Sequence, residues 1–269
     1  MSRTARALLS LGAGLAAALV SVVGVPDPAQ AAAPSYVALG DSYSSGVGTR
    51  SYLSDGTSCQ RSSYAYPRLV AAQKGYALSF QACSGATVST VASGQLGVLS
   101  SGTDYVSISV GGNDAGFTGV LTECAKPGWM SSCNAAIDKA QAFINGTLPG
   151  RLATLYAAIK AKAPAAVVVV VGYPRLFMGE DCNAATFFSP AEETRLNATA
   201  DLLNAKLSAA ASAKGFKWAN PTSRFTGHAV CDAPEWLNGL SNPISESYHP
   251  NRLGHSSGYQ PLVAGLLVG

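Results

Sequence analysis

From residue 36 onward, short apolar runs alternate with longer stretches of mixed polarity. Five short runs predict strands, at residues 36–39, 76–81, 104–110, 165–171 and 216–219. The run at 165–171 reads AAVVVVV without a polar interruption. Such a run predicts a strand that is buried on both faces, as in a parallel sheet covered by helices.

Longer amphipathic stretches between these runs predict helices at residues 64–73, 135–162, 190–214 and 252–268. Gly146 and Pro149 predict a break in the second of them. The third opens on the sequence SPAE from Ser189, which has the form of an N-cap, a first-turn proline and an acidic first turn. Strands alternating with helices predict an α/β fold, a three-layer α/β/α sandwich around a parallel sheet.

Each of the first three predicted strands ends in a turn of small or polar residues. The turns read GDSYSSG at 40–46, CSGAT at 83–87 and GGND at 111–114. The carboxyl ends of parallel strands meet at one sheet edge, where open α/β sheets bind their ligands. Ser42 would start the helical turn after the first strand, where free N–H groups favour a developing negative charge. We therefore take Ser42 as a candidate nucleophile, although Gly-Asp-Ser alone is also an ordinary turn.

An acyl-transfer site needs a base and hydrogen-bond donors beside its nucleophile. His249 is the favoured base, because it lies in a loop that Pro250 restricts at the start of the last predicted helix. The two other histidines, His228 and His255, are interpreted as a loop residue and a packing residue. Three oxyanion donors could converge on one point, namely the backbone N–H groups of Ser42 and Gly85 and the side-chain amide of Asn113.

The first 33 residues have the pattern of a secretory signal peptide. Arg3 and Arg6 precede an apolar run, and small residues then offer cleavage near Ala31 or Ala33. A membrane anchor is the competing interpretation, but the small-residue exit favours cleavage. We therefore expect residues 1–33 to be removed and residues 34–269 to form one secreted, extracellular domain.

The mature chain would carry 16 basic and 14 acidic residues, a net charge of +2. This charge gives no indication of nucleic-acid binding or of a polybasic membrane contact. All six cysteines follow the predicted signal peptide, which indicates disulfides. Six cysteines allow 15 pairings, of which Cys124–Cys133 is the first we would assign because it closes a short loop. Zinc is the alternative, but the spacings do not suit it.

Four blocks stand in order along the chain, namely GDSYS from Gly40, SGAT around Gly85, GGND ending in Asn113 and Asp114, and SYHP around His249. Together they resemble the four blocks of the SGNH, or GDSL, hydrolase family, and they span nearly the whole mature chain. The export signal and the six cysteines look most like the secreted actinobacterial GDSL lipases and phospholipases.

The resemblance implies a flavodoxin-like SGNH fold and a two-step hydrolysis of an ester without a metal or organic cofactor. It implies Ser42 as the nucleophile, His249 as the base, and Ser42, Gly85 and Asn113 as the oxyanion hole. It also implies three disulfides, Cys59–Cys83, Cys124–Cys133 and Cys182–Cys231. The partners we expect are a lipid or other acyl-ester substrate, with no nucleic acid, no stable membrane insertion and a monomeric enzyme.

The chain departs from the family pattern in two places. Tyr43 stands where the first block often has leucine, and Glu246 stands three residues before the histidine, where the family often has aspartate. Glu246 could orient His249 as a triad acid does. In some relatives a backbone carbonyl orients the histidine, and here the carbonyl of Ser247 is in position for that. We slightly favour the carbonyl and keep Glu246 as its rival.

Three other functions fit parts of this sequence pattern. An α/β-hydrolase would need the elbow G-x-S-x-G, but residue 44 is serine. A metal-dependent phosphoesterase could use Asp41, Asn113, Asp114 and His249, although it would need more ligands. A non-catalytic secreted binding domain is the third alternative.

Within the ester hydrolases we favour a triacylglycerol lipase acting on long acyl chains. Phospholipase A and short-chain or carbohydrate acetyl esterase are the alternatives. The loops at 44–63, 176–188 and 236–244 are expected to line an acyl groove, with apolar side chains from Phe177, Met178, Phe187, Phe188 and Trp236.

Overall fold

Five parallel strands form the centre of the structure, a computed structural model that describes residues 32–268. In the order in which they lie in the sheet, the strands are β2 (Ala77–Phe80), β1 (Ser35–Gly40), β3 (Tyr105–Ser109), β4 (Val167–Val171) and β5 (Lys217–Ala219). All four pairings are parallel, which confirms the predicted sheet. Apart from its last two residues, the predicted signal peptide lies outside the described residues.

Helices connect the strands as the sequence pattern predicts, with three additions. The α-helices are α1 (Ser42–Ser45), α2 (Tyr66–Lys74), α3 (Val88–Gly94), α4 (Phe117–Cys124), α5 (Cys133–Gly146), α6 (Leu148–Lys162), α7 (Pro190–Ser212), α8 (Thr222–Phe225) and α9 (Gln260–Leu266). The predicted break near Gly146 and Pro149 separates α5 from α6. The last predicted helix contains a π-helical segment, Gly254–Tyr259, before α9. We did not predict α3, α4 or the single-turn α8, whose residues we expected to belong to a loop.

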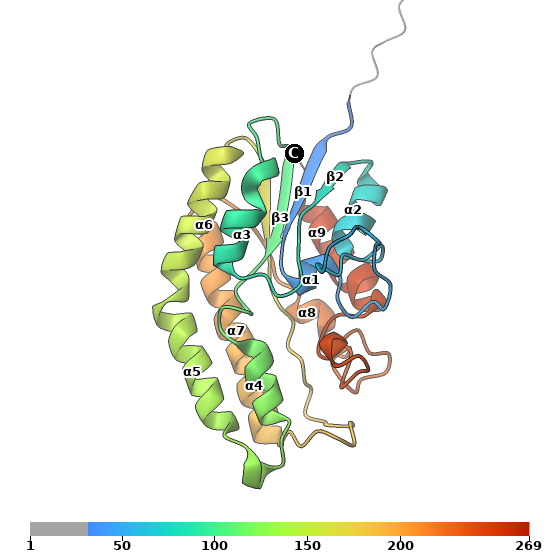
Figure 1. Ribbon diagram of the computed structural model, residues 1–269, viewed down its shortest axis with the longest axis vertical. Coiled ribbons are helices and arrows are strands. Elements are labelled where there is room, and N and C mark those ends of the chain that lie inside the picture. The colour runs from blue at the N-terminus through green and yellow to red at the C-terminus, as the bar shows by residue number, and fades with distance from the viewer. Residues whose placement is uncertain (1–31, 269) are drawn as a thin grey trace, which may run out of the picture. The chain divides into compact units, whose positions relative to one another are not determined.

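Side chains from the strands alternate between two apolar cores, one on each face of the sheet. Tyr36 and Ala38 of β1 belong to the core that α2 and α9 cover. Val37 and Leu39 belong to the core covered by α3, α6 and α7. Figure 1 shows these two helical layers on either side of the strands. The three-layer α/β/α architecture is therefore confirmed.

The order of the strands reverses at β1, because β2 lies on one side of it and β3 on the other. The crevice outside the carboxyl ends at such a reversal is the usual ligand site of this class of sheet. The GDSYS turn leaves β1 at that edge, and the GGND turn leaves β3 beside it. The topology therefore brings two of the four sequence blocks together.

Three disulfides connect the loops around this edge, in the pairing that the family resemblance implied: Cys59–Cys83, Cys124–Cys133 and Cys182–Cys231. No cysteine within residues 32–268 is free. Cys59–Cys83 joins the long loop after α1 to the turn that carries Gly85, and the Ser84 N–H donates to the Cys59 carbonyl at 3.0 Å. A search of residues 32–268 finds no helix with the length and apolar character of a membrane span.

Candidate active site

Ser42 is the first residue of α1, directly after a sharp turn at the end of β1. The turn depends on Gly40, whose φ of +124° favours glycine and whose added Cβ would lie 2.3 Å from the Ser109 carbonyl oxygen. Asp41 then caps α1 by accepting the Tyr43 N–H at 3.0 Å. This local chemistry holds Ser42 at the helix start, with its N–H free of any hydrogen bond to another described group.

Asp41 is itself buried, with 1% of its surface exposed. Its carboxylate accepts hydrogen bonds from the Ser109 hydroxyl at 2.9 Å and from the Tyr173 hydroxyl at 2.5 Å. Burial raises the pKa of Asp41 to about 6, and these hydrogen bonds oppose that rise. The carboxylate therefore joins the cap of α1 to β3 and to the segment after β4.

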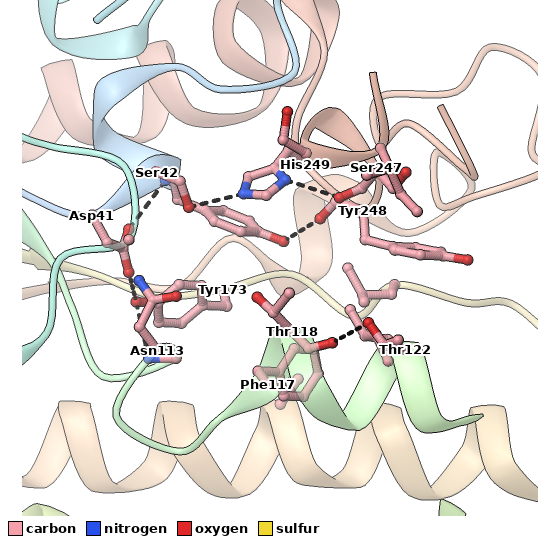
Figure 2. Close-up of a pocket in the computed structure, with 18 of the residues that line it drawn as sticks. Asp41, Ser42, Asn113, Phe117, Thr118, Thr122, Tyr173, Ser247, Tyr248 and His249 are labelled. Carbon is pink, nitrogen blue, oxygen red and sulfur yellow. Dashed lines mark hydrogen bonds between the residues drawn. The ribbon is translucent and has the colours of Figure 1, made fainter. Parts of the chain in front are cut away.

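His249 connects Ser42 to a backbone carbonyl, as Figure 2 shows. Its Nε2 lies 2.8 Å from the Ser42 hydroxyl oxygen, and its Nδ1 lies 2.9 Å from the Ser247 carbonyl oxygen. A carbonyl can only accept, so Nδ1 carries the proton and Nε2 accepts from the Ser42 hydroxyl. Burial lowers the pKa of His249 to about 4, so the ring is neutral at pH 7 and able to take a proton.

The loop around His249 is fixed by contacts from both of its neighbours in space. The Tyr43 hydroxyl donates to the Tyr248 carbonyl at 2.7 Å, and the His249 carbonyl accepts the Asn238 N–H at 2.9 Å. Gly48 packs so closely against this loop that an added Cβ would lie 2.9 Å from the His249 Cβ. The ring is therefore positioned by the residues after the candidate nucleophile.

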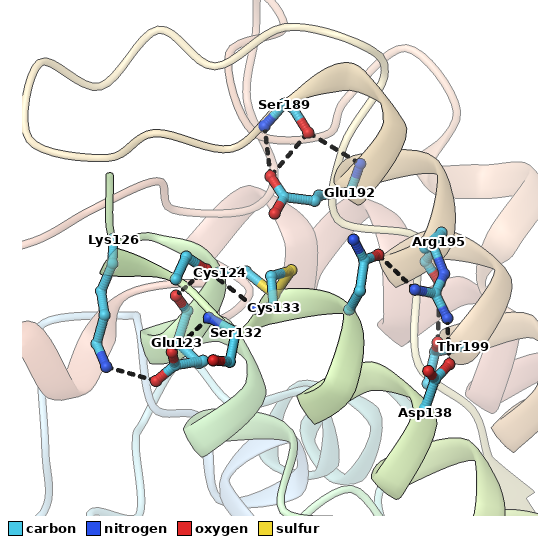
Figure 3. The surroundings of a disulfide bond; sticks show 12 residues. Glu123, Cys124, Lys126, Ser132, Cys133, Asp138, Ser189, Glu192, Arg195 and Thr199 are labelled. Atoms are coloured by element: carbon cyan, nitrogen blue, oxygen red, sulfur yellow. Dashed lines mark hydrogen bonds and ion pairs between the residues drawn. A yellow bond between two sulfur atoms is a disulfide. The ribbon is translucent and has the colours of Figure 1, made fainter. Parts of the chain in front are cut away.

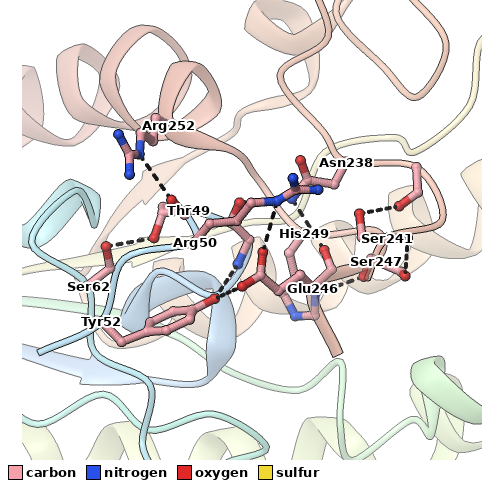
Figure 4. A network of polar contacts seen from close by, with 12 residues as sticks. Thr49, Arg50, Tyr52, Ser62, Asn238, Ser241, Glu246, Ser247, His249 and Arg252 are labelled. Carbon is pink, nitrogen blue, oxygen red and sulfur yellow. Dashed lines mark hydrogen bonds and ion pairs between the residues drawn. The ribbon is translucent and has the colours of Figure 1, made fainter. Parts of the chain in front are cut away.

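Glu246 makes no hydrogen bond to His249, although both belong to the same loop (Figure 4). Its carboxylate is 2% exposed, accepts the Tyr52 hydroxyl at 2.7 Å and lies 3.5 Å from the Arg50 Nε. Two groups were expected to orient the histidine, and in the structure it is the Ser247 carbonyl that accepts the hydrogen bond from His249 Nδ1. The Glu246 carboxylate instead binds the loop that follows α1.

The three expected oxyanion donors lie in one pocket with Ser42 and His249, since Gly85 and Asn113 both line it. The Asn113 amide donates one hydrogen bond to the Ala86 carbonyl at 2.9 Å, which leaves its second N–H available. Asp114 accepts the Val88 N–H at 2.8 Å and so holds the start of α3 beside the same turn. These two contacts keep the Gly85 turn and the Asn113 turn together.

The other two histidines have structural contacts, as we expected. His255 is fully buried, and its Nδ1 accepts the Tyr66 N–H at 3.2 Å. Burial lowers the pKa of His255 to about 3. His228 stacks on Trp236 with 3.8 Å between ring centroids, and its Nδ1 lies 2.9 Å from the Pro234 carbonyl oxygen. Neither ring contacts Ser42.

The pocket beside Ser42 and His249 has a volume of about 550 Å³ and is mainly apolar. One wall is α4, whose Phe117, Thr118 and Thr122 face the Ser42–His249 pair in Figure 2. The opposite walls come from residues 173–186 and 240–249. Two of the three loops predicted to form the groove therefore contribute, whereas the loop at 44–63 does not.

The prediction of which apolar residues line the groove was wrong. The pocket lining includes none of the five predicted residues, Phe177, Met178, Phe187, Phe188 and Trp236. Phe177 and Phe188 are buried in the core and pack against Tyr248, so the loop that carries them directs these two rings away from the pocket. The apolar lining comes instead from Phe117 and Leu121 of the unpredicted α4, and from Leu176, Leu240 and Ile244.

Sequence reasoning also missed two polar residues that support the site. Gln95 is buried, accepts the Gly40 N–H at 2.7 Å and donates to the Gly40 carbonyl at 2.9 Å. Tyr173 donates to Asp41 and accepts the Gly112 N–H at 3.4 Å. The zinc alternative finds no support here: within residues 32–268 the one grouping of three candidate ligands includes Cys182 and Cys231, whose sulfurs are joined to each other.

Comparisons with known proteins agree with this geometry. The family model described as GDSL-like Lipase/Acylhydrolase matches residues 38–256. Lipase 1 of Streptomyces coelicolor is 46% identical over 96% of this chain and 94% of its own length. The extracellular lipase of Streptomyces rimosus matches with a TM-score of 0.82 and 45% identity, over 87% of this chain and all of that one.

Phospholipase A1 from Streptomyces albidoflavus matches with the same TM-score of 0.82 and 44% identity, again over 87% of this chain and the whole of the other. The relatives thus include both a lipase and a phospholipase, and the two solved structures share this fold. The chain accordingly belongs to the GDSL-like lipase/acylhydrolase family and is a carboxylic ester hydrolase of the lipase/esterase class.

Proposed function

We propose that Ser42 and His249 are the catalytic pair of a secreted lipase that hydrolyses long-chain acyl esters, with triacylglycerols as its first substrate class. The observation that carries the proposal is the continuous contact from the Ser42 hydroxyl through His249 to the Ser247 carbonyl, at the mouth of an apolar pocket. The carbonyl fixes the tautomer in which Nε2 can accept a proton.

The reaction has two steps. His249 takes the proton of the Ser42 hydroxyl as the oxygen attacks the ester carbonyl, and the negative charge forms on the former carbonyl oxygen. The N–H groups of Ser42 and Gly85 and the free N–H of Asn113 stabilise that charge. His249 then protonates the leaving alcohol. Water attacks the acyl-enzyme in the same way and releases the fatty acid.

The pocket supports an acyl chain as the bound group. Phe117, Leu121 and Leu176 line it, with Leu240 and Ile244 toward solvent, so a long apolar chain gains free energy by leaving water. A phospholipid also carries such chains, and a relative at 44% identity is a phospholipase A1. Phospholipase A is therefore the second candidate. An acetyl group would leave most of this lining uncovered, which disfavours a carbohydrate acetyl esterase.

Three observations support secretion. The residues before Pro34 have the signal-peptide pattern, three disulfides indicate an oxidising compartment, and the Streptomyces rimosus relative is an extracellular lipase. The proposal includes cleavage near Ala31 or Ala33 and a single monomeric domain over residues 34–269.

The experiment is hydrolysis of a p-nitrophenyl ester series from acetyl to palmitoyl by the purified protein, with chelator present. The rate is expected to rise toward long chains and to fall on the order of 10⁴-fold or more in Ser42→Ala. Asn113→Ala should lower kcat about 10²- to 10³-fold. Equal rates for Ser42→Ala and wild type would refute the mechanism. Comparing triolein with phosphatidylcholine then separates the lipase from the phospholipase.

A further inference from the structure

Exposed apolar side chains gather on the three segments that form the outer walls of the pocket, residues 125–132, 174–188 and 240–248. Each segment contributes residues to the pocket lining, including Ala125, Leu176 and Ile244. Ten large apolar side chains among residues 32–268 are more than a third exposed, and six of them lie on these segments: Trp129, Met130, Met178, Phe187, Leu240 and Ile244. We call these six residues the apolar rim.

Trp129 and Met130 are the most exposed pair of the apolar rim, at 86% and 56%. They lie at the tip of the connection between α4 and α5, at one end of the described domain in Figure 1. Tryptophan buries a large area when it is covered, so this exposure leaves much apolar surface in water. Isolated exposed apolar residues are ordinary, but six around one pocket indicate a binding surface.

The tip is held in place by its base, as Figure 3 shows. The Cys124–Cys133 disulfide closes the connection, and the Ser132 N–H donates to the Glu123 carboxylate at 2.8 Å. The Ser131 hydroxyl donates to the Glu123 carbonyl at 2.9 Å. A structure that fixes its own base while presenting Trp129 to solvent is preorganised for contact with a partner.

The charges on these segments select the kind of partner. The structure describes all three segments, and their two cations are already in ion pairs, Lys126 with Glu123 and Arg175 with Asp201. The remaining charged groups of the segments are carboxylates. No free cation therefore faces an anionic lipid headgroup, whereas an apolar rim with an exposed tryptophan suits the headgroup boundary of an uncharged or zwitterionic lipid.

We propose that the apolar rim docks the enzyme on a zwitterionic lipid surface, with Trp129 and Met130 entering the boundary between headgroups and acyl chains. Docking there sets the mouth of the pocket against the surface, because Leu240 and Ile244 belong to both the rim and the lining. An acyl chain can then pass from the lipid into the pocket with little apolar surface crossing water. The inference rests on the proposed lipid-ester function.

The test uses vesicles of ether-linked phosphatidylcholine, which contains no ester for the enzyme to cleave. Wild type is expected to sediment with the vesicles, and the double variant Trp129→Ser/Met130→Ser should bind at least about tenfold more weakly. Turnover of soluble p-nitrophenyl butyrate should stay within about twofold of wild type. Equal vesicle binding by wild type and the variant would overturn the inference.

Val98→Ser is the matched control. Val98 is 44% exposed, lies outside the three rim segments and does not line the pocket, so this variant should bind vesicles like wild type. Equal weakening by both substitutions would count against a specific rim.

A second readout on wild type does not depend on how a variant folds. Trp129 is the most exposed of the three tryptophans, so tryptophan emission should shift to the blue when vesicles are added. Unchanged tryptophan emission would overturn the inference. Self-association of wild type without lipid that the double variant abolishes would overturn it too, because the rim would then bind a second copy of the protein. Vesicle binding that requires phosphatidylglycerol and is lost in salt would also overturn it. Failure of the proposed function would look different, because wild type would then not hydrolyse p-nitrophenyl palmitate, whether or not it binds the vesicles.

Discussion

Replacing Glu246 with glutamine asks whether a carbonyl or a carboxylate orients His249. The substitution keeps the size of the side chain and an oxygen that can accept the Tyr52 hydroxyl, now at 2.7 Å. It removes the negative charge that lies 3.5 Å from the Arg50 Nε. It leaves the contact between His249 Nδ1 and the Ser247 carbonyl unchanged.

The expected loss is small because the lost ion pair is weak. The Arg50 side chain is 61% exposed, and a pair so open to water contributes about 0–1 kcal/mol. Even if all of it were lost from the transition state, kcat/KM would fall only about fivefold. A triad acid behaves differently, since replacing the carboxylate of a triad by an amide lowers kcat about 10⁴-fold.

The assay is kcat/KM on p-nitrophenyl butyrate for wild type and Glu246→Gln, with Tyr52→Phe as the control. Tyr52→Phe leaves the buried Glu246 carboxylate without its hydrogen-bond donor, which should lower the free energy of unfolding by about 1–3 kcal/mol with little change in kcat. A loss of more than about 10³-fold in folded Glu246→Gln would show that the carboxylate orients His249, and our account of the site would be wrong.

Three further outcomes follow from the same geometry. The acid limb of kcat/KM on a soluble ester should lie near pH 4, because burial lowers the pKa of His249 from 6.5 and the base stays neutral down to that pH; a midpoint at 6.5 or above would contradict this. Gly48→Ala should lower both Tm and kcat, because the φ of Gly48 is +97° and the new Cβ would lie 2.9 Å from the His249 Cβ. Gly56→Ala is the control: Gly56 has a φ of +74° but open space around it, so this substitution should lower Tm alone. Tyr173→Phe removes a hydrogen bond that lowers the pKa of Asp41, so that pKa should rise above about 6 and the free energy of unfolding should fall by about 1–3 kcal/mol; an unchanged Tm would refute the structural role of this contact.

The strands and the order of the sequence blocks could be predicted because their signals are local. The valine run of β4 and the turns after β1 and β3 can each be recognised from a few consecutive residues. The break between α5 and α6 was likewise marked by Gly146 and Pro149. Parallel pairing then brought Ser42 and Asn113 to the same edge without any further information.

The pocket could not be predicted in the same way, because its main wall is a helix with a weak signal. The sequence of α4, FTGVLTEC, contains glycine and β-branched residues that favour a helix poorly. It is stabilised by tertiary contacts, since Val120, Leu121 and Cys124 are buried and Cys124 is bonded to Cys133. Without α4, apolar residues from the predicted loops at 176–188 and 236–244 were assigned to the groove instead.

Gln95 and Tyr173 show a second limit. Gln95 binds Gly40 across 55 residues, and Tyr173 binds Asp41 across 132. No pattern near either residue indicates a buried partner, because each contact exists only after the sheet has brought the strand ends together. Such supporting residues are visible only in three dimensions.

The most direct measurement of the central claim is to locate the covalent intermediate. Wild-type protein is treated with a long-chain alkyl p-nitrophenyl phosphonate, and the labelled peptide is fragmented by tandem mass spectrometry. We predict one adduct, on Ser42, which forms in step with the loss of ester hydrolysis. An adduct on the buried neighbours Ser44 or Ser45, or complete inhibition without modification of Ser42, would contradict it.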